Sequence, residues 1–267
     1  MPNPSPHNIQ MPFSMKHARS SGFFNPRAIA LLAPILTRDY YYFKDDFDNL
    51  AIASNTYWAT ATTGAGGAAP VLNVQPGGAA RFTTGGGNPG VSTLYGAAAI
   101  HATDDNPFFH VRFKWPAAKT TFVAEFGLTS VLTTKTTVGV SDVDTPAVAN
   151  GVVDAVILVM DSSQTLTTPA LVGVGTSTAV AKTNVTDRAG TAYAPTVSKW
   201  VDLYLGARVG KGYCEIYEND VFINQISVAS GPDTATNLFP YFLMKDLGTS
   251  KVVDMDLFEI ITERNTR

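Results

Sequence analysis

The sequence contains little charge and almost no cysteine. Of its 267 residues, 19 are Lys or Arg and 22 are Asp or Glu, which amounts to 15% charged residues and a net charge of −3. Folded domains usually carry about 25%. Because basic residues are neither in excess nor clustered, the chain lacks the electrostatic surface that nucleic acid requires. The single Cys214 excludes an intramolecular disulfide framework and a cysteine-based zinc cage.

Long apolar runs are also missing. The longest near the start, Ala28 to Leu36, contains Pro34 and is less than half of the roughly 20 residues that cross a bilayer. We therefore expect no membrane-spanning helix and no membrane partner. Basic residues precede this run as in a signal peptide, but it begins late and no small-residue cleavage site follows it. Residues 27–36 are instead expected to form a short helix or part of an extended arm.

Residues 1–37 differ in composition from everything after them, since they are rich in proline and contain no acidic residue. Each proline removes a backbone donor and fixes φ, so this segment pairs poorly in a sheet. We expect an extended N-terminal arm over residues 1–37 and a β-sandwich domain over 38–267. Ordering the arm costs conformational entropy, so its apolar residues would need burial against a partner or a sister subunit. They are Met11, Phe13, Met15, Phe23, Phe24 and Ile29.

From Tyr40 onward, short apolar or alternating runs are separated by Gly, Pro, Asn, Asp and Thr, a pattern typical of an all-β sandwich or barrel. Two segments with very little charge, 129–151 and 162–191, are expected to be long loops or extra hairpins that carry contact surface. Trp200–Val209, Gly212–Tyr217 and Val221–Val228 are expected to form a three-strand meander. The remaining expected strands are Tyr40–Phe47, Thr56–Thr62, Val71–Gln75, Ala79–Thr84, Val91–Ala98, Phe108–Trp115, Thr121–Leu128, Asp154–Met160, Leu171–Lys182, Tyr241–Lys245 and Val252–Thr262.

Three candidate sites have simple structural explanations. His110 alternates with apolar neighbours, so we expect it to face outward from a strand, and no second His lies at a metal-ligand spacing. The glycine-rich stretches Gly64–Gly67 and Gly85–Gly90 do not lead into a helix, so they are expected to be wide turns rather than phosphate-binding loops. Asp45–Asn49 offers oxygen donors for calcium but lacks the Gly and terminal Glu of an EF-hand loop, which favours a turn.

The best candidate for catalysis is the string Asp254-Met255-Asp256-Leu257-Phe258-Glu259. It resembles the Glu-x-Asp-x-x-Glu strand of laminarinase-type glucanases, and this resemblance implies a two-carboxylate glycosidase. The first position, however, is Asp instead of Glu. Strict alternation also places Glu259 on the face opposite the two Asp side chains, so only a β-bulge would gather all three. We expect regular alternation, with the acids facing solvent or a partner and a core face formed by Val253, Met255, Leu257 and Ile261.

The succession of strands carries a further resemblance. An early Phe47 and Trp58 precede a glycine-rich stretch with Arg81–Gly85, and later segments follow in order: Phe109–Lys114, Phe122–Leu128, Asp154–Met160, Trp200–Leu203, the Tyr213–Val221 hairpin and Val253–Leu257. Over residues 40–263 this order resembles a family of phage virion proteins, although a hairpin that often carries Asp-Gly has Asn219-Asp220 here. The resemblance implies an all-β, concanavalin-like jelly-roll sandwich of antiparallel sheets in a head or tail structural protein without catalytic residues or cofactors.

Three functions follow as hypotheses. The leading one is a non-enzymatic capsid decoration or cement protein that docks on the major capsid protein or other virion proteins through its arm and one sandwich face. It would be a homo-oligomer on the capsid surface, assembled in the host cytoplasm. The second is a glycan-binding receptor module of a tail or fibre, in which Tyr40, Tyr41, Tyr42, Tyr57 and Trp58 stack on sugars. The third is an endoglucanase centred on Asp254, Asp256 and Glu259.

Overall fold

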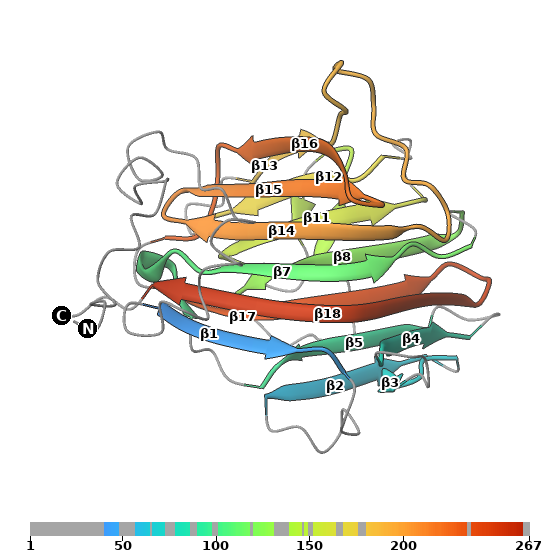
Figure 1. The fold of residues 1–267 in the computed structure, drawn as a ribbon. Helices are drawn as coiled ribbons and strands as arrows, with labels where there is room; N and C mark the ends of the chain where they lie inside the picture. Colours follow the sequence, from blue (N-terminus) through green and yellow to red (C-terminus); the bar gives the residue numbers. More distant parts are fainter. Residues whose placement is uncertain are drawn as a thin grey trace, which may run out of the picture.

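The computed structural model describes residues 40–47, 57–64, 66–72, 78–85, 90–97, 101–117, 120–130, 139–145, 147–148, 152–163, 168–175, 180–233 and 236–263 (Figure 1). The expected helix at 27–36 lies outside these ranges. So do the six arm residues expected to contact a partner, which are Met11, Phe13, Met15, Phe23, Phe24 and Ile29. Among the described residues, no helix is long and apolar enough to cross a membrane.

The described chain is built almost entirely of strands, together with the short 3-10 helix η2 (Thr103–Asp105). The strands are β1 (Tyr40–Asp45), β2 (Trp58–Thr63), β3 (Val71–Leu72), β4 (Ala80–Thr84), β5 (Val91–Gly96), β6 (His101–Ala102), β7 (Phe108–Lys114), β8 (Phe122–Thr129), β9 (Val140–Asp142), β10 (Ala147–Val148), β11 (Ala155–Asp161), β12 (Ala170–Val174), β13 (Val180–Asn184), β14 (Trp200–Arg208), β15 (Lys211–Glu218), β16 (Val221–Val228), β17 (Asn237–Asp246) and β18 (Lys251–Glu263).

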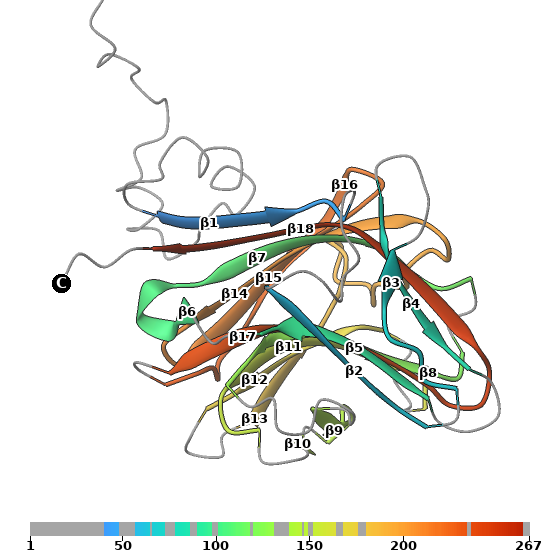
Figure 2. The same cartoon turned by 90° about the horizontal axis from the view of Figure 1, so that it is seen from below.

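All strands except β9 and β10 form two antiparallel sheets that pack face to face (Figure 2). Sheet A has the order β16-β15-β14-β7-β18-β4-β3, and β1 also pairs with β18. Sheet B has the order β13-β12-β11-β8-β17-β5-β2, and β6 also pairs with β17. The first described strand, β1, therefore lies beside the last one, β18 (Figure 1). An antiparallel β-sandwich was the predicted fold class, and it is confirmed.

Alternation of side chains along each strand explains how the core between the sheets forms. In β7, Phe109, Val111 and Phe113 belong to the core cluster, and the residues between them face outward. In β11 every residue is buried, because Val156 and Leu158 face sheet A whereas their neighbours enter a second apolar cluster on the other side. A continuous apolar run is the sequence pattern of such a doubly covered strand.

The second cluster lies where the sequence predicted either a long loop or an extra hairpin. The segment 129–151 contains the hairpin β9–β10, which covers the face of sheet B turned away from sheet A (Figure 2). Val140 and Val143 from this hairpin region pack with Ile157 and Val159 of sheet B. One strand prediction was wrong: Leu171–Lys182 is divided into β12 and β13, which pair with each other.

The two glycine-rich stretches contact each other through their backbones, which is consistent with the predicted turns. Gly85 donates its backbone N–H to the carbonyl of Gly66, and a Cβ on Gly66 would lie 2.3 Å from the Cα of Gly85. Only glycine permits this backbone approach. In their described parts neither stretch leads into a helix, as predicted for turns that do not bind phosphate.

The outer edge of β16 is closed by side chains. Residues 221–228 contain no charged residue and no proline, and such an edge is a template for pairing with another chain. Here, however, the Asn224 side chain accepts a hydrogen bond from the backbone N–H of Gln225, at 2.9 Å. The Thr183 hydroxyl of β13 donates to the carbonyl of Ser227, at 2.8 Å. Both bonds occupy backbone groups that an added strand would use.

Removing these two side chains should expose the edge. We expect Asn224→Ala combined with Thr183→Val to cause concentration-dependent association, because the N–H of Gln225 and the carbonyl of Ser227 become available for strand pairing. Sedimentation velocity at several protein concentrations measures the effect. Ser227→Ala is the matched control, since it changes the same strand but leaves both bonds intact. A double variant with the mass of the wild type at all concentrations would contradict the role of these caps.

Candidate functional site

A polar cluster on the outer face of sheet A is the candidate site. His110 of β7 lies opposite Tyr204 of β14 and opposite Glu259 of β18 in the strand register. The sequence predicted that His110 faces outward, and it does lie on the outer face. It is nevertheless buried, with 7% of its surface exposed. The site thus occupies the middle of the sheet, where three adjacent strands each supply a polar residue.

Both ring nitrogens of His110 face carboxylates. Nε2 lies 2.8 Å from Oδ1 of Asp202, and Nδ1 lies 3.0 Å from Oε2 of Glu259. The imidazole also stacks on the ring of Tyr204, with 4.1 Å between centroids. Tyr42 of β1 donates a hydrogen bond to Glu259 at 2.8 Å. A neutral imidazole has one N–H and can satisfy one carboxylate, so this geometry fits the doubly protonated cation.

The electrostatics of the cluster favour that cation. Burial on its own lowers the pKa of His110, but the hydrogen bonds and charges of Asp202 and Glu259 outweigh it and raise the pKa above 6.5. Burial likewise tends to raise the pKa of Glu259, yet the hydrogen bonds from His110 and Tyr42 lower it overall. The cluster is therefore a largely buried ion triad.

A β-bulge in β18 brings the three acids of the glucanase-like string to one face. Asp254 and Met255 lie opposite Lys114 and Phe113, but the next paired residue is Leu257, so Asp256 is the extra residue of a bulge. After the bulge, Phe258 and Ile260 enter the core in place of the predicted Leu257 and Ile261. The expected regular alternation was wrong beyond Met255, because a period-2 pattern contains no signal for an inserted residue.

Each of these acids already has a cationic partner. Asp254 accepts two hydrogen bonds from Arg81, at 2.7 and 2.9 Å. Asp256 lies 3.9 Å from Nε of Arg112, and Glu259 is held by His110 and Tyr42. Burial raises the pKa of Asp256, whereas the charge of Arg112 partly opposes this shift. The string forms a row of ion pairs across the sheet.

The outer face of sheet B holds a second buried acid, Glu125 of β8, which is 0% exposed. Its carboxylate accepts hydrogen bonds from the backbone N–H groups of Gly139 and Val140, at 2.8 and 2.9 Å, and from the Tyr241 hydroxyl at 2.8 Å. Burial raises the pKa of Glu125, and these three hydrogen bonds oppose the shift without cancelling it. Glu125 thus holds the β9–β10 hairpin against sheet B, and the hairpin covers this part of its outer face.

Several other predicted candidates are structural. Of the aromatic residues proposed to stack on sugars, Trp58 lies in the core, and Tyr41 and Tyr57 pack against it. Asp45 accepts hydrogen bonds from the backbone of Phe47 and from Trp58 Nε1, both at 2.8 Å, as expected of a turn after a strand. Within the described ranges, no three His, Cys, Asp or Glu side chains are grouped to hold a metal ion.

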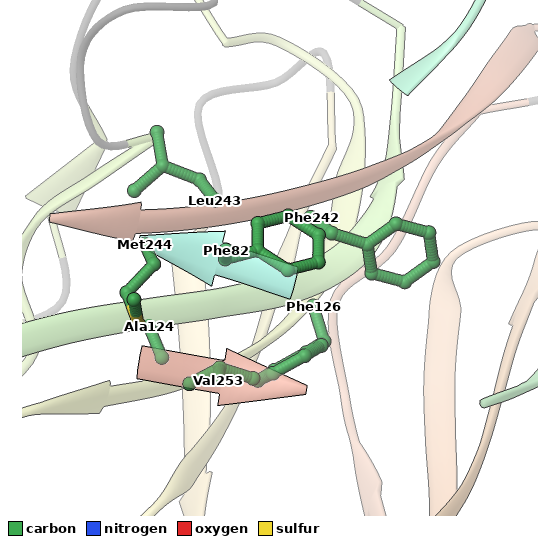
Figure 3. A pocket seen from close by; sticks show the side chains of 7 residues that line it. All are labelled: Phe82, Ala124, Phe126, Phe242, Leu243, Met244 and Val253. Carbon is green, nitrogen blue, oxygen red and sulfur yellow. The ribbon is translucent and has the colours of Figure 1, made fainter. Parts of the chain in front are cut away.

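A cavity between the two sheets has a volume of about 10 Å³ (Figure 3). A cavity of this size is at the lower limit of what can hold one water molecule, and a water needs polar partners. All the side chains that line the cavity are apolar, namely Phe82, Ala124, Phe126, Phe242, Leu243, Met244 and Val253. The cavity is therefore a small gap in the core and no ligand site.

Sequence reasoning missed two members of these clusters. Asp202 was assigned only to a strand of the meander, and the sequence gives no register that places it against His110. Glu125 had a usable signal, because it stands alone among the apolar residues of Phe122–Leu128. A single acid in such a strand is rarely buried without partners. Here its partners are Gly139 and Val140 at the start of the β9–β10 hairpin and Tyr241 of the adjacent strand β17.

Comparisons with known proteins identify the fold. No protein-family model matches the sequence, and no curated protein is similar to it. Among solved structures, peanut lectin is similar with a TM-score of 0.58 and 10% identity, covering 86% of this chain and 100% of that one. The Ca²⁺-bound exoplasmic/lumenal domain of VIP36 is similar with a TM-score of 0.54 and 12% identity, covering 85% and 91%.

SCLam, a non-specific endo-β-1,3(4)-glucanase of family GH16, is also similar, with a TM-score of 0.54 and 10% identity, and the match covers 85% of this chain and 92% of that one. The chain therefore has the concanavalin-like jelly-roll sandwich that the strand order predicted. Identities this low establish the fold alone. The resemblance to phage virion proteins is not tested by these comparisons and stays a prediction.

Proposed function

We propose that the chain is a non-enzymatic structural protein of a phage virion, in particular a capsid decoration protein. It docks through the arm of residues 1–37 and one face of the sandwich, bridges neighbouring capsid subunits and opposes the outward pressure of the packaged genome. The sequence supports this proposal through the strand order, the low charge and the apolar arm. Low charge suits surfaces that neighbours cover in an assembly.

One observation carries the non-enzymatic part of the proposal. The acids that resemble a glucanase motif are held by the cationic side chains Arg81, Arg112 and His110. A glycosidase needs one carboxylic acid that can give up a proton and one free carboxylate. Paired acids of this kind suit a rigid structural sheet. Release of reducing ends from β-glucans by the wild type, abolished by Asp256→Asn, would contradict this part.

Deletion of residues 1–37 tests docking through the arm. We expect the truncated protein to fold but to be lost from purified capsids, because the arm supplies contact area that the compact body cannot reach. Quantitative mass spectrometry of the particles measures occupancy, and circular dichroism of the free protein checks that the sandwich is intact. The matched control is the full chain with only Phe23→Ala and Phe24→Ala, which should lower occupancy less. Full occupancy of the truncated protein would reject docking through the arm.

A second candidate function is glycan binding by a tail or fibre module. Peanut lectin and an endo-β-1,3(4)-glucanase share the fold, and half-buried aromatic residues line the outer face of sheet A. Tyr217 and Phe222 continue a row of ring contacts that begins at His110 and Tyr204. The Tyr217 ring meets that of Tyr204 edge to face, with 6.0 Å between centroids, and the tilted Phe222 ring lies 5.3 Å from that of Tyr217. A glycan array with no signal above background would reject this candidate.

A further inference from the structure

A basic and aromatic surface lies beside the ion triad on the outer face of sheet A. Trp200, the first residue of β14, pairs with Lys114, the last residue of β7. Arg112 lies two residues before Lys114 and opposite Asp202, so both cations and Trp200 share one face. The guanidinium carbon of Arg112 is 5.5 Å from the centroid of the Trp200 ring, and the Lys114 ammonium is 5.7 Å from it. We call these three residues the Trp200 surface.

The positive charge of this surface is incompletely neutralised within the described chain. Nε of Arg112 is buried but has no hydrogen-bond partner there, and its nearest carboxylate oxygen, on Asp256, lies 3.9 Å away. Among the described residues, Lys114 interacts through its contact with the indole. Two like charges held over one ring repel each other, and an anion beside them would relieve that repulsion. The surface therefore complements a negatively charged group.

The neighbouring groups narrow the chemistry of that ligand. The half-buried indole offers a flat apolar surface, and the carboxylate of Asp256, whose side chain is 35% exposed, is a hydrogen-bond acceptor. A sugar ring that carries a carboxylate matches all three features: its C–H face packs on the indole, its carboxylate meets the cations, and its hydroxyls donate to Asp256. Nucleic acid fits less well, because a backbone phosphate diester has no hydroxyl to donate to Asp256, whereas a uronate ring carries hydroxyls beside its carboxylate.

We propose that the Trp200 surface binds an acidic sugar, of the uronic acid class. This inference rests on the second candidate function, glycan binding, and adds its location and sugar class. It does not depend on the capsid-docking proposal. Binding should weaken with salt, since Arg112 and Lys114 are partly exposed and their ion pairs with a ligand would be screened.

The test measures binding of the full-length chain to polygalacturonate and hyaluronan, with the neutral glucans dextran and laminarin in parallel. We expect binding to the two uronate polymers, an affinity loss of about tenfold or more in Trp200→Ala, and a smaller loss in Lys114→Gln. Lys211→Gln is the matched control, because Lys211 is an exposed cation beside Arg208, at the opposite end of β14 from Trp200. It should bind like the wild type, and thermal melts confirm that each variant is folded.

Each other outcome overturns a specific part. Equal binding of neutral and uronate polymers, or uronate binding that survives Trp200→Ala, rejects the proposed site but leaves glycan binding standing. If no polymer binds and a glycan array shows no signal above background, the acidic-sugar site and the glycan-binding function are both rejected. Stronger binding of an oligothymidylate than of the uronate polymers, lost in Trp200→Ala, assigns the surface to phosphates and bases and rejects the sugar.

Discussion

Replacing His110 by leucine should destabilise the sandwich by about 3 kcal/mol or more. The substitution removes the cation between Asp202 and Glu259, and it leaves two largely buried carboxylates without their shared partner. Removing one member of a buried ion pair usually costs about 3–5 kcal/mol. Chemical denaturation at about pH 6, close to the unfolded pKa of histidine, measures the difference between the wild type and the variant.

The same cluster predicts how stability depends on pH. The folded pKa of His110 is raised above 6.5, so its contribution is complete below the unfolded pKa and is lost as pH rises through the folded value. We expect the wild type to lose stability as the pH rises above about 6.5, the unfolded pKa of histidine, and His110→Leu to lose less. Other charged or titratable groups lie near the triad and belong to neighbouring strands: Tyr42 and Lys44 on β1, Tyr204 on β14, Arg112 on β7 and Asp256 on β18.

A triple variant separates loss of charge balance from loss of packing. His110→Leu combined with Asp202→Asn and Glu259→Gln removes the carboxylates that the single variant leaves unpaired. The main cost of removing one partner from a buried ion pair is the charge left unpaired. The triple variant leaves no such charge in the triad, so we expect it to recover much of the stability and to show little pH dependence. Parallel pH profiles for the wild type and His110→Leu would contradict the assignment of His110 as the cation.

The contrast between His110 and β18 shows what strand patterns reveal in this sequence. Alternation placed His110 on the outer face, and it also placed Phe109, Val111 and Phe113 in the core. The pairing of β7 with β14 and β18 lies beyond alternation, because register depends on contacts between strands far apart in the sequence. The sequence therefore predicted the face on which His110 lies but not its burial or its two carboxylate partners.

For related reasons, the sequence pattern alone did not establish the bulge at Asp256 or the hairpin over sheet B. A bulge inserts one residue against a partner strand, and the string Val253–Ile261 reads equally well with or without it. The segment 129–151 has little charge and is rich in Val, Thr and Ala, which fits an exposed loop in an assembly as well as an apolar cover. The deciding feature is Glu125, whose burial requires donors that this segment supplies.

Replacing Glu125 by glutamine should loosen the β9–β10 hairpin and lower the stability by about 3 kcal/mol. The carboxylate accepts three hydrogen bonds from fully or largely buried donors, and a buried donor left unsatisfied costs about 1–3 kcal/mol. The carbonyl oxygen of glutamine can replace one carboxylate oxygen as an acceptor. Its NH₂ group would then replace the other oxygen and face a backbone or hydroxyl donor. We expect fast hydrogen exchange at Gly139 and Val140 and a lower midpoint of chemical denaturation.

Two matched variants locate the cause in the carboxylate. Tyr241→Phe removes one of the three donors and leaves the clamp on the hairpin backbone, so a loss of about 1 kcal/mol is expected. Glu218→Gln alters a carboxylate that holds a different segment through Tyr193 and Thr196, and it should leave exchange at Gly139 and Val140 unchanged. If Glu125→Gln exchanges these two amides as slowly as the wild type, the hairpin is held by the apolar contacts of Val140 and Val143 alone, and the clamp has no energetic role.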